Sequence, residues 1–365
     1  MDIRAFTDSG RLLSDRAALT RRLATDGYVF LPGFLPAHRV ATVRDTVLTL
    51  AREAGWLLPG RPRDPLPVAN PAAAVWPPDP RYARVHRSMW SCRALHALLH
   101  DPALLALLED LLGEPVFVHP RKVLRVVHPR APGAPPESGW HQDHPGVQGS
   151  PRTLTVWTPL TPVTADSGSL CVLPGSHGHG QLPMRLSNEA VVGWEADIRP
   201  SSCLSNPMNP GDLLIIDPFT VHRGTPNTSR TLRISTDCRY QPLHEPVNEG
   251  CVELLGEPYT WDEVYRTWPR GTDDPLAYYW KRQPARTVPY DAAPDDRRDQ
   301  QALAAGRAGD RGALRALRIA ARHSPDPDTV AEAQALCRSL STPPAQDHNA
   351  APTHLQHHEN HENHG

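Results

Sequence analysis

Lysine is almost missing from this chain. Lys122 and Lys281 are the only lysines, although lysine and arginine together number 38. The formal net charge is −2, so the chain lacks the basic excess typical of proteins that bind nucleic acid. We therefore expect no nucleic-acid partner. The preference for arginine, together with 41 prolines, indicates a GC-rich coding sequence, and we expect a bacterial source of the actinomycete kind.

Long apolar runs and paired cysteines are missing as well. No apolar run approaches the roughly 18 residues that a membrane-spanning helix needs, so we expect no membrane partner. The 6 cysteines form no C-x-x-C pair, and residues 1–10 carry charges where a secretory signal needs apolar residues. We expect reduced thiols and a cytoplasmic location. The sequence leaves the oligomeric state open.

Helical patterns come first along the chain, and strand patterns follow. Apolar residues at helical spacing predict helices over 15–25 and 36–53 and a helical pair over 92–100 and 102–112. Short β-branched or apolar runs bounded by turns predict strands at 28–31, 116–118, 123–127, 153–157, 169–173, 213–216 and 231–240. We predict a mainly β protein, in which an antiparallel sandwich or barrel carries flanking helices on its outside.

Composition divides the chain into three expected parts. Residues 1–290 are expected to form one domain, with a helical part at about 14–112, a β core at about 116–242 and an aromatic-rich wrap at about 243–290. A helical extension is expected over 291–341, with Ala-rich helices at 302–322 and 327–340. Internal glycines weaken the first of these helices. The His-rich tail 342–365 is expected to be disordered.

The stretch Gly139-Trp140-His141-Gln142-Asp143 carries the first chemical signal. Residues i and i+2 of a strand project from the same face, so His141 and Asp143 can meet at one point. A nitrogen and an oxygen donor make two-thirds of a 2-His-1-carboxylate site, which suits non-haem Fe(II). Taken alone, the same pair is equally an ordinary polar pair on the surface of a strand.

A third ligand and a fork for an anion follow the apolar strand 213–216. His222 begins the next β segment, and Arg233 stands eleven residues further on, followed by Ser235. Arg233 and Ser235 share a face of a strand, where a guanidinium and a hydroxyl can hold a small carboxylate. An iron triad beside such a fork indicates 2-oxoglutarate as the co-substrate, with its 5-carboxylate at Arg233.

These residues belong to a longer series of motifs. The series comprises Asp26-Gly27-Tyr28-Val29, Leu111-Leu112-Gly113, Trp140-His141-Gln142-Asp143, Val156-Trp157-x-x-Leu160, Gly168-Ser169-Leu170, Leu173-Pro174-Gly175-Ser176-His177, Gly211-Asp212, His222 and Arg233-x-Ser235. In these motifs the chain resembles the phytanoyl-CoA dioxygenase superfamily of Fe(II)/2-oxoglutarate-dependent oxygenases, over residues 15–285 or so.

The resemblance implies a fold, a cofactor and a set of residue roles. The implied core is a double-stranded β-helix, that is, a cupin-like jelly roll, and Fe(II) acts with 2-oxoglutarate and O2 as co-substrates. The implied iron ligands are His141, Asp143 and His222. Among the co-substrate residues, Arg233 is the implied anchor of the 5-carboxylate, with Ser235 and Trp157 beside it. Gln142 is implied to line the pocket.

The expected activity is hydroxylation, or another oxidation, of an unactivated C–H bond in a small molecule, with release of succinate and CO2, in bacterial natural-product biosynthesis. Asp143 favours this outcome over halogenation, because related halogenases carry a small residue at that position. The long loop 178–210, with Trp194 and Arg199, is expected to help select the substrate. The alternatives are a non-catalytic jelly-roll binding protein and a metal-only cupin-type enzyme, which would have no use for Arg233-x-Ser235.

Overall fold

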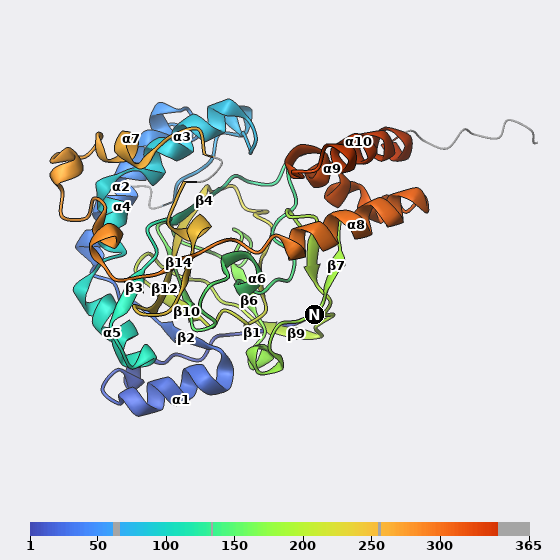
Figure 1. Ribbon diagram of the computed structural model, residues 1–365. Coiled ribbons are helices and arrows are strands. Elements are labelled where there is room, and N and C mark those ends of the chain that lie inside the picture. Colours follow the sequence, from blue (N-terminus) through green and yellow to red (C-terminus); the bar gives the residue numbers. More distant parts are fainter. Residues whose placement is uncertain (61–65, 133, 255–256, 342–365) are drawn as a thin grey trace, which may run out of the picture.

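Helices and antiparallel sheets contribute together to this fold (Figure 1). The computed structural model describes residues 1–60, 66–132, 134–254 and 257–341. Within them the protein is a mixed α and β structure, whereas the sequence predicted a mainly β one. The predicted disorder of the tail 342–365 lies outside the described residues. No helix in the described part of the chain is both long and apolar enough to cross a membrane.

The larger sheet has six strands and is antiparallel throughout. Its path is β2 (Tyr28–Leu31), β10 (Leu213–Ile216), β5 (Leu154–Pro159), β12 (Arg233–Pro242) and β3 (Val116–Val118), with β4 (Val123–Val127) also paired to β12. Alternate residues of these strands enter two different apolar clusters. Both faces of the sheet are therefore covered, which explains why the central strand β10 is a continuous apolar run, Leu-Leu-Ile-Ile.

A smaller sheet covers the inner face of the larger one. Its order is β1 (Asp2–Arg4), β9 (Ser202–Leu204), β6 (Leu170–Val172) and β11 (His222–Gly224), with β1 and β9 parallel. Side chains of both sheets meet in one buried cluster, which includes Tyr28, Phe30, Trp157, Val172, Leu204, Leu214 and Ile216. Strands β1 and β9 were not predicted, because neither of these three-residue segments is a β-branched or apolar run.

A helical layer covers the outer face of the larger sheet. It contains α1 (Arg16–Asp26), α2 (Ala37–Glu53), α3 (Pro80–Trp90), α4 (Arg93–Leu98) and α5 (Pro102–Leu112). Asp79 and Asp101 cap α3 and α5 with their side chains, and a proline follows each of them at the first helical position. The helices α1, α2 and α5 were predicted to within a residue or so, but α3 was not predicted.

The aromatic segment after the barrel strands packs against this helical layer. Trp261 and Trp268 donate their indole N–H groups to the carbonyls of Val252 and Ser91, and both rings are buried in the main core. The segment contains α7 (Trp261–Tyr265) and the short parallel pair β13 (Val247–Asn248) and β14 (Thr287–Val288). Single-turn 3-10 helices occur at Gly10–Leu12, Pro71–Ala73, Ser176–His179, Glu249–Cys251, Gly271–Asp273, Tyr279–Arg282 and Arg311–Ala313.

The last helices form a unit with its own small core. They are α8 (Ala293–Arg307), α9 (Leu314–His323) and α10 (Pro327–Ser341), and they lie on the side of the molecule away from α2 and α5 (Figure 1). The predicted single helix over 302–322 is wrong, because the chain turns at Gly309, where φ is +79°. Helix α8 contacts a hairpin formed by β7 (Met184–Leu186) and β8 (Trp194–Ala196).

Candidate metal centre

Two histidines from distant parts of the chain are joined by their backbones. The N–H of His141 donates to the carbonyl of His222 and the reverse bond is also present, each at 2.9 Å. This backbone bridge places the centroids of the two imidazole rings 4.2 Å apart. His222 opens strand β11, as predicted.

Asp143 reaches the same place in a way that the sequence did not indicate. We expected His141 and Asp143 on one strand, but His141 forms only an isolated bridge, and Asp143 has helical angles (φ −73°, ψ −33°) at the start of α6 (His144–Val147). The turn of the chain, not strand alternation, brings the carboxylate beside the imidazoles. His144 stacks on Phe219 and does not line the cavity described below.

One donor atom from each of these three side chains lies within 4.8 Å of the others. The Nδ1 atom of His141 pairs with the carbonyl of Gly139 at 2.9 Å, and Nδ1 of His222 pairs with the carbonyl of Thr220 at 3.0 Å. Because each Nδ1 is occupied, each Nε2 is left facing Asp143 Oδ1, at 3.8 and 3.9 Å. Metal-binding histidines are commonly oriented by such backbone contacts.

The electrostatics of the site favour the metal-binding protonation states. Burial, and then the neighbouring His222, lowers the pKa of His141 to about 3, which keeps its imidazole neutral. Burial alone would raise the pKa of Asp143, but Arg239, His222, His141 and the Thr155 hydroxyl hold it well below its usual range. Thr155 Oγ1 donates to Asp143 Oδ2 at 2.5 Å, and Arg239 Nη2 donates to Oδ1 at 3.3 Å. Two imidazoles and one ionised carboxylate form the 2-His-1-carboxylate donor set that suits Fe(II).

Arg233 is a buried cation without a carboxylate partner among the described residues. Its side chain lies on β12, only 4% of the residue is exposed, and Nη1 donates to Ser235 Oγ at 2.5 Å. Its Nε has no hydrogen-bond partner in the described structure. Burial, and then the charge of Arg125, lowers the pKa of Arg233 to about 10, so the guanidinium stays protonated at neutral pH. An unpaired buried charge is costly, and this one can be neutralised by an anion entering from the cavity.

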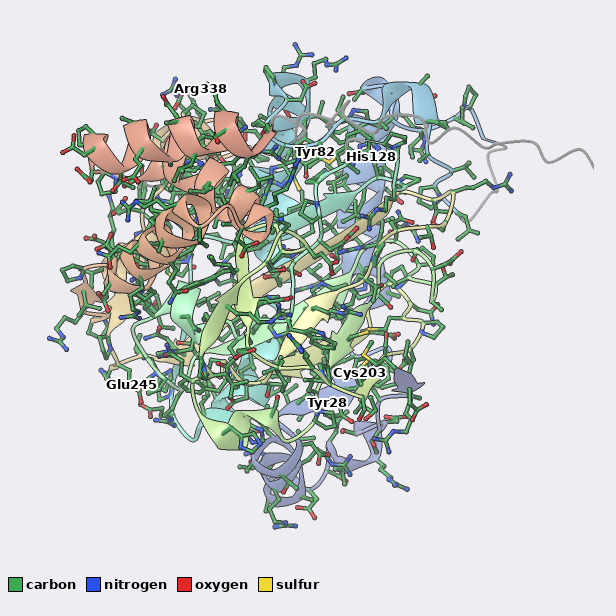
Figure 2. The ribbon with its side chains drawn as sticks, turned by 90° about the vertical axis from the view of Figure 1, so that its right-hand side faces the viewer. Tyr28, Tyr82, His128, Cys203, Glu245 and Arg338 are labelled. Atoms are coloured by element: carbon green, nitrogen blue, oxygen red, sulfur yellow. The ribbon has the colours of Figure 1, made fainter. Side chains whose placement is uncertain are left out.

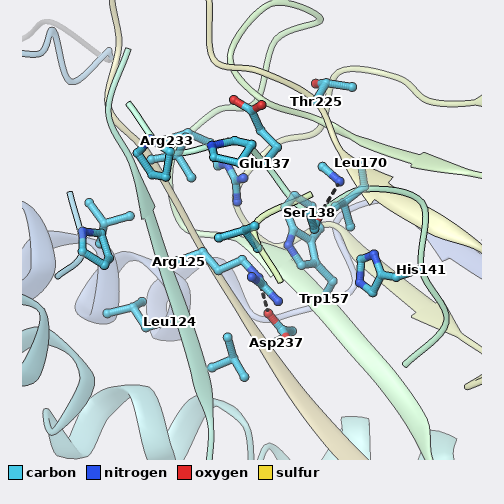
Figure 3. Close-up of a pocket in the computed structure, with 18 of the residues that line it drawn as sticks. Leu124, Arg125, Glu137, Ser138, His141, Trp157, Leu170, Thr225, Arg233 and Asp237 are labelled. Atoms are coloured by element: carbon cyan, nitrogen blue, oxygen red, sulfur yellow. Dashed lines mark hydrogen bonds and ion pairs between the residues drawn. The ribbon is translucent and has the colours of Figure 1, made fainter. Parts of the chain in front are cut away.

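A cavity of about 280 Å³ joins this guanidinium to the three donor side chains. Thr155, Trp157 and Asp237 line it from the larger sheet, and Leu170 from the smaller one. Figure 3 shows Arg125, Asp237, Trp157 and His141 around this space. Arg125 Nε donates to Asp237 Oδ1 at 3.2 Å. Two loops add Trp76, Pro77, Ala134, Pro135 and Pro136 to the apolar part of the wall.

The structure distributes the predicted site residues between the cavity and other places. His141, Asp143, His222, Arg233 and Trp157 line it, and the indole N–H of Trp157 has no partner among the described residues. Ser235 is fully buried behind Arg233 and is absent from the described lining. Its hydroxyl accepts from the guanidinium instead.

The three remaining predicted pocket residues lie away from the described lining. Gln142 points the other way from its neighbours: its amide donates to the carbonyls of Gly180 and Phe219, and its oxygen accepts from the N–H of Leu182. Trp194 is half-buried in β8, and Arg199 is exposed beyond that strand. The expectation for these two rested on their place in a long loop, but part of that loop folds into the β7–β8 hairpin and part into β9.

Sequence reasoning missed several residues of the wall. His128 follows β4, is only 2% exposed, lines the cavity, and has no hydrogen-bond partner for either ring nitrogen in the described structure. It packs edge-on against Trp56 and Trp76, and burial lowers its pKa to about 4. Figure 2 shows His128 close to Tyr82, another residue of the wall. Arg125 could have been found by its alternation with Val123 and Val127, which face the same cavity.

Comparisons with known proteins agree with this geometry. The model of the phytanoyl-CoA dioxygenase (PhyH) family matches residues 23–235. The 1-deoxypentalenic acid 11-beta-hydroxylase of Streptomyces arenae is 30% identical over 254 residues, which cover 65% of this chain and 85% of that protein. The enzyme of the same name from Streptomyces exfoliatus is 30% identical over 250 residues, with the same two coverages. Among solved structures, the epimerase SnoN, determined with Fe3+, alpha ketoglutarate and nogalamycin RO, superposes with a TM-score of 0.49 at 21% identity, over 67% of this chain and 92% of that one.

The chain therefore belongs to the phytanoyl-CoA dioxygenase family. It is a non-haem Fe(II)/2-oxoglutarate-dependent oxygenase, with a His-Asp-His donor set of the expected kind. The family match ends at residue 235, so the aromatic segment and the helices α8 to α10 lie outside it.

Proposed function

We propose that His141, Asp143 and His222 hold the iron and that Arg233 binds the 5-carboxylate of 2-oxoglutarate. The observation that carries this proposal is the charge pattern of one cavity, in which an ionised carboxylate and two imidazoles lie at one place, and a guanidinium with no carboxylate partner among the described residues lies at another. A guanidinium presents a planar fork that matches a carboxylate in two parallel hydrogen bonds. The alternative of a metal-only enzyme leaves this buried cation without a role.

When bound, iron with 2-oxoglutarate and dioxygen supplies an oxidant able to attack an unactivated C–H bond, with release of succinate and CO2. The protein residues orient the participants. Thr155 and Arg239 fix the rotamer of Asp143 by binding both of its oxygens. Ser235 holds the Arg233 guanidinium, and Trp157 offers an unpaired N–H to the same cavity.

The substrate that we propose is a small, largely apolar molecule with a polar or anionic group, and the reaction is its hydroxylation. The cavity wall combines Trp76, Pro77 and Tyr82 with Arg125 and His128, so apolar contacts are available next to polar ones. The similar Streptomyces enzymes are named as hydroxylases of an acid, 1-deoxypentalenic acid. The intact Asp143 carboxylate leaves no position for a halide among the protein ligands, which favours hydroxylation.

We further propose that the two facing sheets form a jelly roll, with a catalytic domain at about residues 1–290 and a helical extension at about 291–341. The antiparallel order β2-β10-β5-β12-β3, facing β1-β9-β6-β11, supports the first point. The separate apolar cluster of α8 to α10 supports the second. A small molecule is the proposed partner of the catalytic cavity.

The test is release of succinate from 2-oxoglutarate by the purified protein with Fe(II), first alone and then with candidate small carboxylic acids. We expect slow uncoupled turnover that a true substrate accelerates. Zinc in place of iron should give none. A protein that binds 2-oxoglutarate but never releases succinate would be the non-catalytic binding protein, and the proposal would then be wrong.

A further inference from the structure

A second hollow, of about 250 Å³, lies between the loop after β7 and the C-terminal helices. The side chains around it are basic or apolar. Its apolar part is Val191, Val192 and Ile319, and its basic part is Arg298, Arg315, Arg318, Arg322 and His323. The two valines lie within the part of the chain that matches the family, and the other residues around the hollow lie outside it.

Among the residues that the structure describes, acidic groups neutralise only one of these arginines. Arg298 pairs with Asp295 at 2.8 Å and with Asp299 at 2.7 Å. Within the described residues, no other arginine of the hollow makes an ion pair. Arg318 and Arg322 make no hydrogen bond there either, and both are exposed at the rim.

The basic residues stand close enough to repel one another. Arg315, Arg318 and Arg322 follow at spacings of three and four along α9, which places them on one face, where like charges are destabilising. Burial, and then Arg322 and Arg318, lowers the pKa of Arg315, which is consistent with that repulsion. A helix face that keeps three such cations gains stability when an anion settles among them.

Hydrogen bonds join the loop between β7 and β8 to the C-terminal helical unit on either side of the hollow. Arg315 donates from Nε and Nη2 to the carbonyl of Val191, at 3.0 and 2.7 Å. Asn188 donates to the carbonyl of Arg311 and accepts from the N–H of Arg315, each at 2.7 Å. At Gly193, φ is +79° and a Cβ would approach Ala316 Cα to 2.8 Å. The loop and α9 are therefore fitted closely, and the two walls of the hollow keep a fixed spacing.

Val191 also lines the catalytic cavity, so the hollow and the cavity share a wall. Its N–H donates to the carbonyl of Glu137, another residue of the catalytic cavity, at 2.9 Å. Val192 is 49% exposed at the rim of the hollow. A ligand in the hollow would cover that apolar surface and would lie beside the catalytic cavity.

We propose that this hollow binds a phosphate group, as a phosphate monoester or diphosphate carried by a small molecule. Guanidinium groups bind phosphate oxygens in pairs of parallel hydrogen bonds. Three arginines without acidic partners match a group with two or more negative charges, whereas a single carboxylate would leave most of that charge unneutralised. The apolar part of the hollow, formed by Val191, Val192 and Ile319, suits the organic part of the same ligand.

Isothermal titration calorimetry with sodium pyrophosphate on the full-length protein tests this site without any turnover. We expect saturable binding near one equivalent that weakens roughly tenfold or more in the double variant Arg318→Gln/Arg322→Gln. The matched control is Arg307→Gln on α8, whose guanidinium is paired with Glu332 away from the hollow. Its affinity should equal that of the unchanged protein.

Two results would overturn the proposal: no saturable binding of pyrophosphate, or equal affinity in the double variant and the unchanged protein. Circular dichroism should show that both exposed substitutions leave the fold intact. The source of the phosphate is a separate question, answered by succinate release. Greater stimulation by phosphorylated candidates than by their dephosphorylated forms places the phosphate on the substrate, and equal stimulation by both assigns it to a separate ligand. Because binding is measured without succinate, failure here leaves the proposed catalytic function standing.

Discussion

Replacing Arg233 with glutamine should separate co-substrate binding from stability. Arg233 is almost completely buried, and its one hydrogen bond in the described structure goes to the Ser235 hydroxyl. Losing a two-pronged, charge-assisted contact with the 5-carboxylate should cost about 3 kcal/mol. That corresponds to a roughly 100-fold weaker Kd for 2-oxoglutarate.

The same substitution should not lower the stability of the folded protein in the absence of 2-oxoglutarate. A buried guanidinium without an ionic partner is itself unfavourable, and removing it relieves the desolvation of an unneutralised charge. We therefore expect the Tm of the ligand-free Arg233→Gln variant to be unchanged or higher. Arg233→Lys keeps the charge but not the fork, and its affinity should fall between those of the other two forms.

Anaerobic titration of the Fe(II) protein with 2-oxoglutarate, followed by its weak visible charge-transfer band, measures the Kd, and differential scanning fluorimetry measures the Tm. Arg130→Gln is the matched control, because Arg130 also lines the cavity but is half-exposed and paired with Glu137. An Arg233→Gln variant with the Kd of the unchanged protein would refute the assignment of Arg233. A large fall in its ligand-free Tm would show that the cation is structural.

Three further outcomes follow from the geometry. Asp143→Ala removes the only carboxylate of the donor set, so iron retention in metal analysis and succinate release should both be lost; full activity would disprove the ligand assignment. His128→Leu should leave the free energy of unfolding unchanged or raise it by about 1 kcal/mol, since neither ring nitrogen has a described partner. The same variant should show less stimulation of succinate release by a true substrate, and unaltered stimulation would exclude a contact between His128 and the substrate. Gly193→Ala combines positive φ with a close approach to Ala316, whereas Gly309→Ala has the same φ and open space around the new methyl group. Chemical denaturation should show the larger loss of unfolding free energy for Gly193→Ala, and equal losses in the two variants would contradict the close fit of the loop against α9.

Much of the larger sheet could be predicted from the sequence. The strand Leu213–Ile216 was predicted to the residue, because a buried central strand has a continuous apolar run and flanking turns, and β12 was predicted to within two residues from its alternation. The short strands β1, β7, β8 and β9 could not be found. Each has three residues, and their pairing comes from contacts across the fold rather than from their own sequence.

The candidate site was predictable in its residues but not in its geometry. His141, Asp143 and His222 do converge, yet the strand argument that suggested it was wrong for Asp143, which sits at the start of a helical turn. Arg233 and Ser235 share a face as expected, but Ser235 serves the arginine rather than the cavity. The roles of Arg239 and Thr155 were not visible in sequence, because both act on Asp143 from strands that only the folded sheet brings near.

The contact of Arg315 with Val191 has a consequence for how this oxygenase can diversify. A helical unit with its own apolar cluster, outside the family match, fixes one wall of the catalytic cavity through a few hydrogen bonds. Changes in that unit can move the wall without touching the residues that bind iron or 2-oxoglutarate. One part of the cavity wall can therefore vary through a stretch of the chain that is separate from the donor side chains His141, Asp143 and His222.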